Sequence, residues 1–244
     1  MHKAISMRLA MVAILVAMMM VSGCVRTDND VVEPGETQTE AKDIEQGAAT
    51  AVEVYIEQGS GHLEVEPGAS KLMEAIFKFN VEQWRPAVTY KDEGDAWNLS
   101  VIQPEQDLRI GSGAKNEWDI KLGVDVPKEL GINLGAGDAD VKASGLNLMD
   151  LWITAGAGQI DLDLTGTWDE DLTIDLNAGA GDIEIRVPSN VGVKLKAIAG
   201  VGDVTANGFT KSGNEYTNDA YDTADVKITI TANAGVGHII ITQI

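Results

Sequence analysis

The residues best spaced for chemistry are five polar side chains, each directly after a glycine motif of the form G-x-G. They are Asp138, Gln159, Asp182, Asp203 and His238. If the motifs stack in register, these side chains form a column in which Asp182 and Asp203 lie about 4.8 Å apart. The column could bind a cation, or each Asp could accept hydrogen bonds from turn amides. Because Ca²⁺ takes about six to eight oxygens, we favour turn capping and predict no metal site.

The sequence lacks the local motifs of common metal-dependent, serine-nucleophile and dinucleotide-binding enzymes. The histidines are His2, His62 and His238, and none belongs to an H-x-x-x-H or H-E-x-x-H pair. No G-x-S-x-G nucleophile motif occurs. The G-x-G motifs lack the third glycine of a dinucleotide-binding turn, and an alternating pattern follows them instead of a helical one. We therefore predict no catalytic residue and no cofactor.

The glycine motif is a repeat. We interpret its glycines as structural parts of turns, because glycine adopts backbone conformations that a Cβ disfavours and lets neighbouring backbones approach closely. The first glycines of the last five copies are spaced 21, 23, 21 and 35 residues apart, and related motifs begin at Gln58 and Ile110. The predicted turn glycines are Gly135, Gly137, Gly156, Gly158, Gly179, Gly181, Gly200, Gly202, Gly235 and Gly237.

Between the motifs, apolar and polar residues alternate. Ile160, Leu162 and Leu164, for example, alternate with Asp161 and Asp163. Alternation with a period of two is typical of a strand with one buried face. A unit of turn and strands cannot bury that face alone and must stack on its neighbours. We predict an all-β fold, a single-domain β-solenoid-like stack of short strands with G-x-G turns and an N-terminal capping half.

Trp152 and Trp168 form a candidate ligand surface. Trp152 has the outward phase of its strand, and Trp168 lies in the corner sequence "TGTWDED". Exposed indoles can stack on sugars or on an apolar partner surface, although such a residue more often covers a corner of the fold. An envelope protein or a glycan is the expected partner. The net charge of −20 makes a nucleic-acid partner improbable.

The first residues have the features of an export signal. Lys3 and Arg8 precede an apolar stretch of about 13 residues, Leu9 to Val21, which is shorter than the roughly 20 residues of a membrane span. It ends at "VSGC", whose Cys24 is the only cysteine of the chain. This sequence resembles the lipobox of prokaryotic lipoproteins, and the resemblance implies lipidation of Cys24. We expect an extracytoplasmic protein, lipid-anchored to the cell membrane or outer envelope.

The rest of the chain resembles the toast-rack family. The matching stretches are "VEVYIEQGSGHLEVEPGASKLMEAIFKFNVEQWRPAVTY", which contains Trp84-Arg85-Pro86, then "NEWDIKLGVDVPKELGINLGAGDADVKASGLNL" and the later glycine repeats. The resemblance covers about residues 50–244. It implies a β-solenoid-like fold related to LiaF-like envelope proteins and adhesins, and it supplies no catalytic residues. LiaF-like regulators carry transmembrane helices beside this domain, whereas this chain has the lipobox-like sequence that ends at Cys24.

These observations divide the chain into four parts. We expect a signal peptide at 1–23, a lipidated Cys24 with a flexible acidic tether at 24–49, a capping toast-rack half at 50–130, and solenoid repeats at 131–244. The expected function is a non-enzymatic module for interaction, adhesion or sensing at the cell envelope. The alternatives are a polysaccharide-acting enzyme on a β-helical scaffold, which would need a carboxylate pair in a groove, and a calcium-stabilised surface protein.

Overall fold

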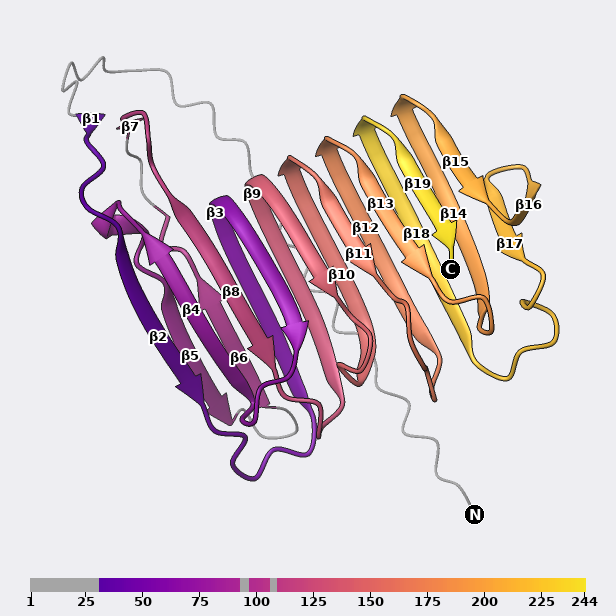
Figure 1. Cartoon of the computed structure of the whole chain (residues 1–244), viewed down its shortest axis with the longest axis horizontal. Helices are drawn as coiled ribbons and strands as arrows, with labels where there is room; N and C mark the ends of the chain where they lie inside the picture. The colour runs from indigo at the N-terminus through magenta and orange to yellow at the C-terminus, as the bar shows by residue number, and fades with distance from the viewer. Residues whose placement is uncertain (1–30, 93–96, 106–108) are drawn as a thin grey trace. The chain divides into compact units, whose positions relative to one another are not determined.

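The structure, a computed structural model, describes residues 31–92, 97–105 and 109–244 (Figure 1). Residues Val31–Ile244 form one compact unit. Nearly all of its regular structure is β, with a single short 3₁₀ turn, η1 (Glu82–Trp84), among the described residues. The predicted all-β class is confirmed. None of the helical segments in the described part of the chain is long and apolar enough to cross a membrane.

Most strands belong to one sheet that folds back on itself into two faces. In spatial order the first face contains β5 (Ala87–Asp92), β6 (Trp97–Ile102), the start of β3 (Val52–Pro67), the start of β9 (Lys128–Lys142), β10 (Leu148–Ala157), β12 (Leu172–Ala180), β18 (Lys227–Val236), β14 (Gly192–Val201), β17 (Glu215–Asn218) and β16 (Phe209–Ser212).

The second face contains β2 (Gln38–Ile44), β4 (Met73–Phe79), β8 (Asn116–Leu122), the end of β3, the end of β9, β11 (Ile160–Asp163), β13 (Ile183–Val187), β19 (Ile239–Gln243) and β15 (Val204–Asn207). Two further short strands, β1 (Val31–Val32) and β7 (Arg109–Ile110), pair with each other. A rung of the stack is a strand of the first face together with the strand of the second face that continues from it. Because β3 and β9 run through both faces, each forms a complete rung by itself.

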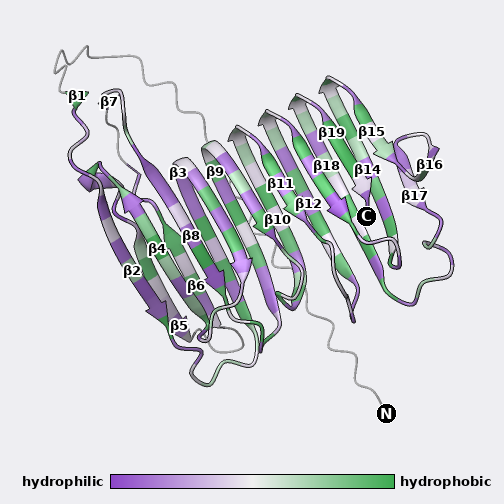
Figure 2. Ribbon diagram, viewed as in Figure 1, coloured by the Kyte–Doolittle hydropathy of each residue, from purple (hydrophilic) through white to green (hydrophobic). Residues whose placement is uncertain are grey.

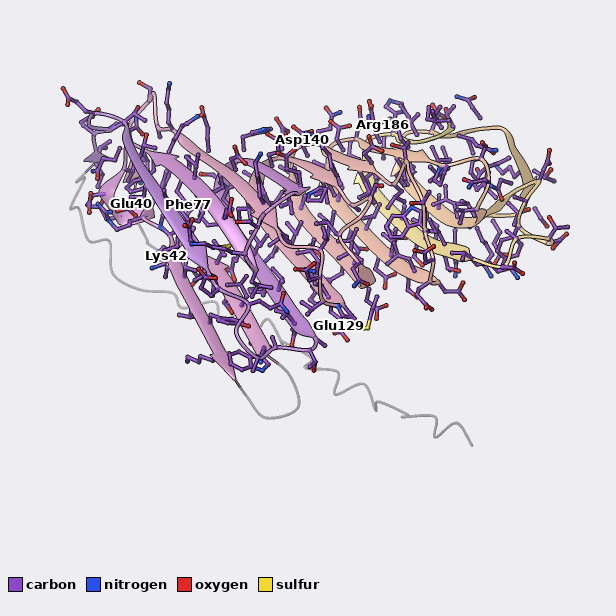
Figure 3. All side chains as sticks on the ribbon, turned by 60° about the horizontal axis from the view of Figure 1, so that its bottom comes forward. Glu40, Lys42, Phe77, Glu129, Asp140 and Arg186 are labelled. Atoms are coloured by element: carbon purple, nitrogen blue, oxygen red, sulfur yellow. The ribbon has the colours of Figure 1, made fainter. Side chains whose placement is uncertain are left out.

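The core lies between the two faces. Inward residues such as Ile174, Leu162 and Ile183 have no exposed surface, and Figure 2 shows apolar and polar residues alternating along the strands. Burying one such side chain stabilises the fold by about 1.5–3 kcal/mol. Polar side chains point outward: Figure 3 shows Asp140, from the second face, and Glu129, from the first, on opposite sides of the molecule. The alternation predicted from the sequence therefore produces a dry interior.

The glycine motifs lie where the chain passes from the first face to the second. Gly181, for example, has φ +141°, and a Cβ on it would collide with the carbonyl oxygen of Gly158 in the neighbouring rung. A residue with a side chain would therefore be unfavourable here for two reasons: its backbone conformation, and the close approach of the next corner. The motif beginning at Ile110 differs, because Ile110 pairs with Val32 in the small separate ladder and forms no corner of the stack.

The rungs do not stack in sequence order. The last rung, β18 and β19, is inserted between β12 and β13 on one side and β14 and β15 on the other. The chain leaves β15 through the hairpin β16–β17, which covers an edge of β14, and then returns to fill the intervening rung. His238 therefore lies between Asp182 and Asp203. Our expectation that these two carboxylates are neighbours is wrong.

The N-terminal part also differs from the expected boundaries. Residues 38–44, expected within a flexible tether, form β2, which pairs antiparallel with β4. Its exposed, polar sequence has no alternating pattern, and the backbone ladder and ion pairs such as Asp43 with Lys71 stabilise it instead. The predicted break at 130/131 falls within β9, and β3 forms the first complete rung rather than part of a cap. Cys24 and the predicted signal lie outside the described residues.

Candidate functional site

The polar column after the glycine corners forms hydrogen bonds between three pairs of neighbouring rungs. Asp138 Oδ1 accepts a hydrogen bond from the Gln159 N–H at 2.9 Å, and Asp182 Oδ1 accepts one from the His238 N–H at 2.7 Å. His238 Nδ1 in turn accepts from the Asp203 N–H at 3.3 Å. The carboxylates thus cap amides of the adjacent rung rather than of their own turn. Among the described residues, no group of three or more His, Cys, Asp or Glu side chains could hold a metal ion.

The two tryptophans of the candidate ligand surface lie apart in the fold. Trp152, on the outer side of β10, lies directly over Gly131 of β9, where a Cβ would collide with the indole. Trp168 packs against the core, and its Nε1 donates to the Leu164 carbonyl at 2.8 Å. Both indoles are half-buried and cover backbone, and neither lines the cleft described next.

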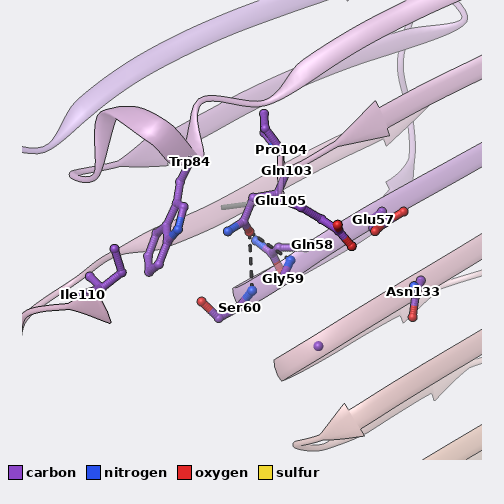
Figure 4. A pocket seen from close by; sticks show the side chains of 11 residues that line it. Glu57, Gln58, Gly59, Ser60, Trp84, Gln103, Pro104, Glu105, Ile110 and Asn133 are labelled. Atoms are coloured by element: carbon purple, nitrogen blue, oxygen red, sulfur yellow. Dashed lines mark hydrogen bonds between the residues drawn. The ribbon is translucent and has the colours of Figure 1, made fainter. Parts of the chain in front are cut away.

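A cleft of about 710 Å³ opens beside the glycine corner of β3 (Figure 4). Figure 4 shows Trp84 and Ile110 on one side, Glu57 and Asn133 on the other, and Ser60 between them. The residues that line it are Glu57, Gln58, Gly59, Ser60, Trp84, Gln103, Pro104, Glu105, Ile110, Asn133 and Gly135. They come from β3, η1, β7, β9 and the segment after β6, so the cleft combines distant parts of the sequence.

The cleft exists because the rung next to β3 has no glycine corner. Between β6 and β8 the chain leaves the stack, and two buried amide side chains replace the missing backbone. Gln103 Oε1 accepts from the Gly59 N–H at 2.9 Å and from Asn116 Nδ2 at 2.7 Å. Asn116 Nδ2 also donates to the Ser60 carbonyl at 2.8 Å, and Trp118 Nε1 donates to Asn116 Oδ1 at 2.8 Å. This network fixes the floor of the cleft.

Gln58 is the unusual residue of the floor. It occupies the inward column that contains Leu134 in the next rung, and it is completely buried. Its Nε2 lies 3.4 Å from the His62 and Asn116 carbonyl oxygens, but its Oε1 has no hydrogen-bond partner among the described residues. Buried polar atoms are rarely left unpaired, because desolvation without a partner costs free energy.

One wall of the cleft is held in place by Tyr55. Its hydroxyl donates to Glu57 Oε2 at 2.8 Å. Burial, and next the hydrogen bond to Glu57, raise the pKa of the Tyr55 hydroxyl above its ordinary value of 10.0, so it remains a donor at neutral pH. The Glu57 carboxylate is thereby oriented before any ligand arrives. Glu105 supplies a second carboxylate, on the segment that follows Gln103.

The whole cleft lies within the region matched by one family model. The N-terminal domain of toast_rack matches residues 33–186, and the model for the cell wall-active antibiotics response protein LiaF, C-terminal, matches residues 134–241. The chain belongs to the toast-rack family. The resemblance inferred from the sequence is confirmed, and the cleft is formed by the N-terminal part of this toast-rack fold.

Solved structures are similar to this toast-rack chain to different degrees. It is 31% identical to a "putative cell adhesion protein" from Clostridium sporogenes, with a TM-score of 0.83 over 86% of this chain and 100% of that one. A "putative adhesin" from Bacteroides fragilis is 10% identical, with a TM-score of 0.36 over 86% of this chain and 100% of that one. The latter likeness is too low to carry an argument. No curated protein matches the chain.

Sequence reasoning missed the cleft of the toast-rack chain. The sequence analysis noted Trp84 only as part of the stretch that resembles the toast-rack family. Glu57 and Glu105 belong to no local motif. The one available signal was Gln58, a polar residue in the inward phase after Val54 and Ile56, which are completely buried. A polar residue in that phase indicates either a buried network or a ligand site.

Proposed function

We propose that this protein is a non-enzymatic interaction module of the cell envelope, active in adhesion or sensing and anchored by a lipid on Cys24. The observation that carries the proposal is the similarity to the "putative cell adhesion protein" of Clostridium sporogenes, which extends over the whole of that chain. The lipobox-like sequence before Cys24 supports the anchor. A lipid anchor would place the described unit at the outer side of a membrane.

The fold suits a binding role. The strands expose broad polar faces, and a cleft with oriented side chains interrupts them beside β3. Such a rigid scaffold loses little conformational freedom when a partner docks, which favours recognition by preformed surfaces.

Retention of envelope components tests the interaction role. The full chain, tethered to beads through a C-terminal tag, is incubated with separated protein and polysaccharide fractions of the envelope, and retained material is identified by mass spectrometry. We expect saturable retention of a defined component at physiological ionic strength. Retention that is unsaturable and disappears in moderate salt would contradict the proposal, because it would reflect only the net charge of −20.

A polysaccharide-acting enzyme is the second candidate, because the cleft contains the two carboxylates Glu57 and Glu105. Glycosidases use such a pair as acid and base or nucleophile. The test incubates the full chain with envelope polysaccharides and measures the release of reducing ends. Release of reducing ends by the wild type that is abolished in both Glu57→Gln and Glu105→Gln would favour the enzyme. If the wild type releases no reducing ends, the binding module is favoured.

A further inference from the structure

We propose that the cleft beside β3 binds a positively charged side chain, an arginine or lysine that a partner protein or peptide presents. The inference rests on the proposed function as an interaction module and names the chemistry that its site would recognise.

The charge of the cleft favours a cation. Glu57 and Glu105 line it, and none of the described residues in the lining is lysine, arginine or histidine. The nearby Arg85 is directed elsewhere, because it pairs with Glu40 and with Glu82. The net charge of −20 adds a field that attracts cations and repels anions. An anionic polymer is therefore a poor candidate for this site.

The two carboxylates of the cleft favour a ligand that is rich in hydrogen-bond donors. The two carboxylates accept hydrogen bonds at the surface of the cleft, and beneath them the completely buried Gln58 Oε1 has no donor among the described residues. A guanidinium group has roughly five N–H donors and an ammonium group roughly three, and neither group accepts hydrogen bonds. Ser60, Asn133 and Trp84 also carry donor groups, so the preference for a cation over a neutral sugar rests on the two negative charges. The hydrogen bond from Tyr55 orients Glu57 in advance and reduces the cost of binding.

Trp84 provides the aromatic side of the cleft. Its position is fixed by η1, in which the Trp84 N–H donates to the Val81 carbonyl at 2.9 Å. A cation over an indole face is attracted by the quadrupole of the ring. A volume of about 710 Å³ exceeds the needs of one side chain and leaves room for the flanking peptide backbone. The ligand is accordingly a basic residue within a peptide segment.

The test uses two capped peptides that differ only in charge. Acetyl-Gly-Arg-Gly-amide and its citrulline counterpart are titrated into the full chain in detergent and followed by calorimetry. We expect saturable binding of the arginine peptide and binding at least about tenfold weaker for the citrulline peptide, since a charge-assisted hydrogen bond is lost. Glu57→Gln and Glu105→Gln should each weaken binding of the arginine peptide by about tenfold, and Trp84→Leu should weaken it also.

Glu53→Gln is the matched control. Glu53 is an exposed residue of β3 outside the cleft, and its substitution changes the net charge by the same amount. It should alter affinity by less than about twofold. Equal affinity for both peptides, equal effects of Glu53→Gln and Glu57→Gln, or no binding of the arginine peptide would each overturn the inference. Saturable retention of an envelope component by the Glu57→Gln variant would then show that the interaction role survives without this site.

Discussion

At the scale of single residues, Lys128 is a charged side chain that the fold buries. It is completely buried at the start of β9, and its Nζ donates to the Val126 carbonyl at 2.5 Å and the Leu146 carbonyl at 3.2 Å. Burial lowers its pKa from 10.5 to about 8. The two carbonyls compensate only part of the cost of burying the ammonium charge, because among the described residues no carboxylate is bonded to it.

Lys128 predicts a specific dependence of stability on pH. Its pKa is lower in the folded chain than in the unfolded chain, so between about pH 8 and 10.5 the unfolded chain binds more protons and stability rises with pH. Across that window the wild type should gain on the order of 2–3 kcal/mol relative to Lys128→Met. Urea unfolding of both proteins at pH 7.5 and 10 measures the difference. Parallel pH profiles would contradict a buried ammonium.

Cys24 carries the prediction about the anchor. In Cys24→Ser no thioether to lipid can form, so the protein should be released from membranes or remain unprocessed. Fractionation of cells, with detection of the chain in membrane and soluble fractions, measures this. A variant that is processed normally and sediments with membranes like the wild type would show that the lipid anchor does not exist.

At the scale of elements, the glycine corners decide how closely rungs approach. Gly181 and Gly68 both have positive φ, +141° and +121°, but only at Gly181 would a Cβ meet neighbouring backbone. Alanine at Gly68 should therefore cost only conformational strain, about 1 kcal/mol. Alanine at Gly181 should cost more, by about 1–3 kcal/mol, because the Gly158 carbonyl must move. Equal losses in chemical denaturation would mean that rung contact is unimportant.

The column of Asp residues makes a second prediction for the corners. Asp182 accepts the His238 N–H, and asparagine keeps an oxygen in that place whereas alanine does not. Asp182→Ala should lower stability by about 1 kcal/mol and Asp182→Asn by clearly less. Calcium should raise the melting temperature no more than sodium chloride of equal ionic strength. A saturable calcium effect that disappears in Asp182→Asn would instead identify the column as a metal site.

At the scale of the whole molecule, the inserted last rung connects β14 and β15 to the rest of the stack. Among the described residues, β18 is the only strand that pairs in parallel with β14, and β19 is the only strand that pairs in parallel with β15. Deleting 227–244 should therefore remove hydrogen-exchange protection from 192–207, because both strands lose their parallel ladders. Deleting 31–44 is the control, since β2 is an edge strand paired with β4. Full protection of 192–207 in the first deletion would show that these strands pair directly with β12 and β13.

The sequence by itself determined the local features of this protein. The alternation of Ile160, Leu162 and Leu164 specifies strands with one buried side, and all three are completely buried. The repeated glycines similarly mark corners, because a backbone conformation that excludes a Cβ is a local property. The polar sequence of β2, however, shows no such alternation, so its pairing with β4 could not be read from it.

Only the tertiary structure decided which rungs are neighbours and which side chains meet. The corners at Gly179, Gly200 and Gly235 have similar sequences, so each could stack on any other. In the structure the hairpin β16–β17 pairs with one edge of β14, and β18 pairs with the other. The cleft likewise joins Glu57 with Trp84 through pairings between segments distant in sequence. Periodicity reports the environment of each residue, whereas long-range pairing depends on the free energy of the whole stack.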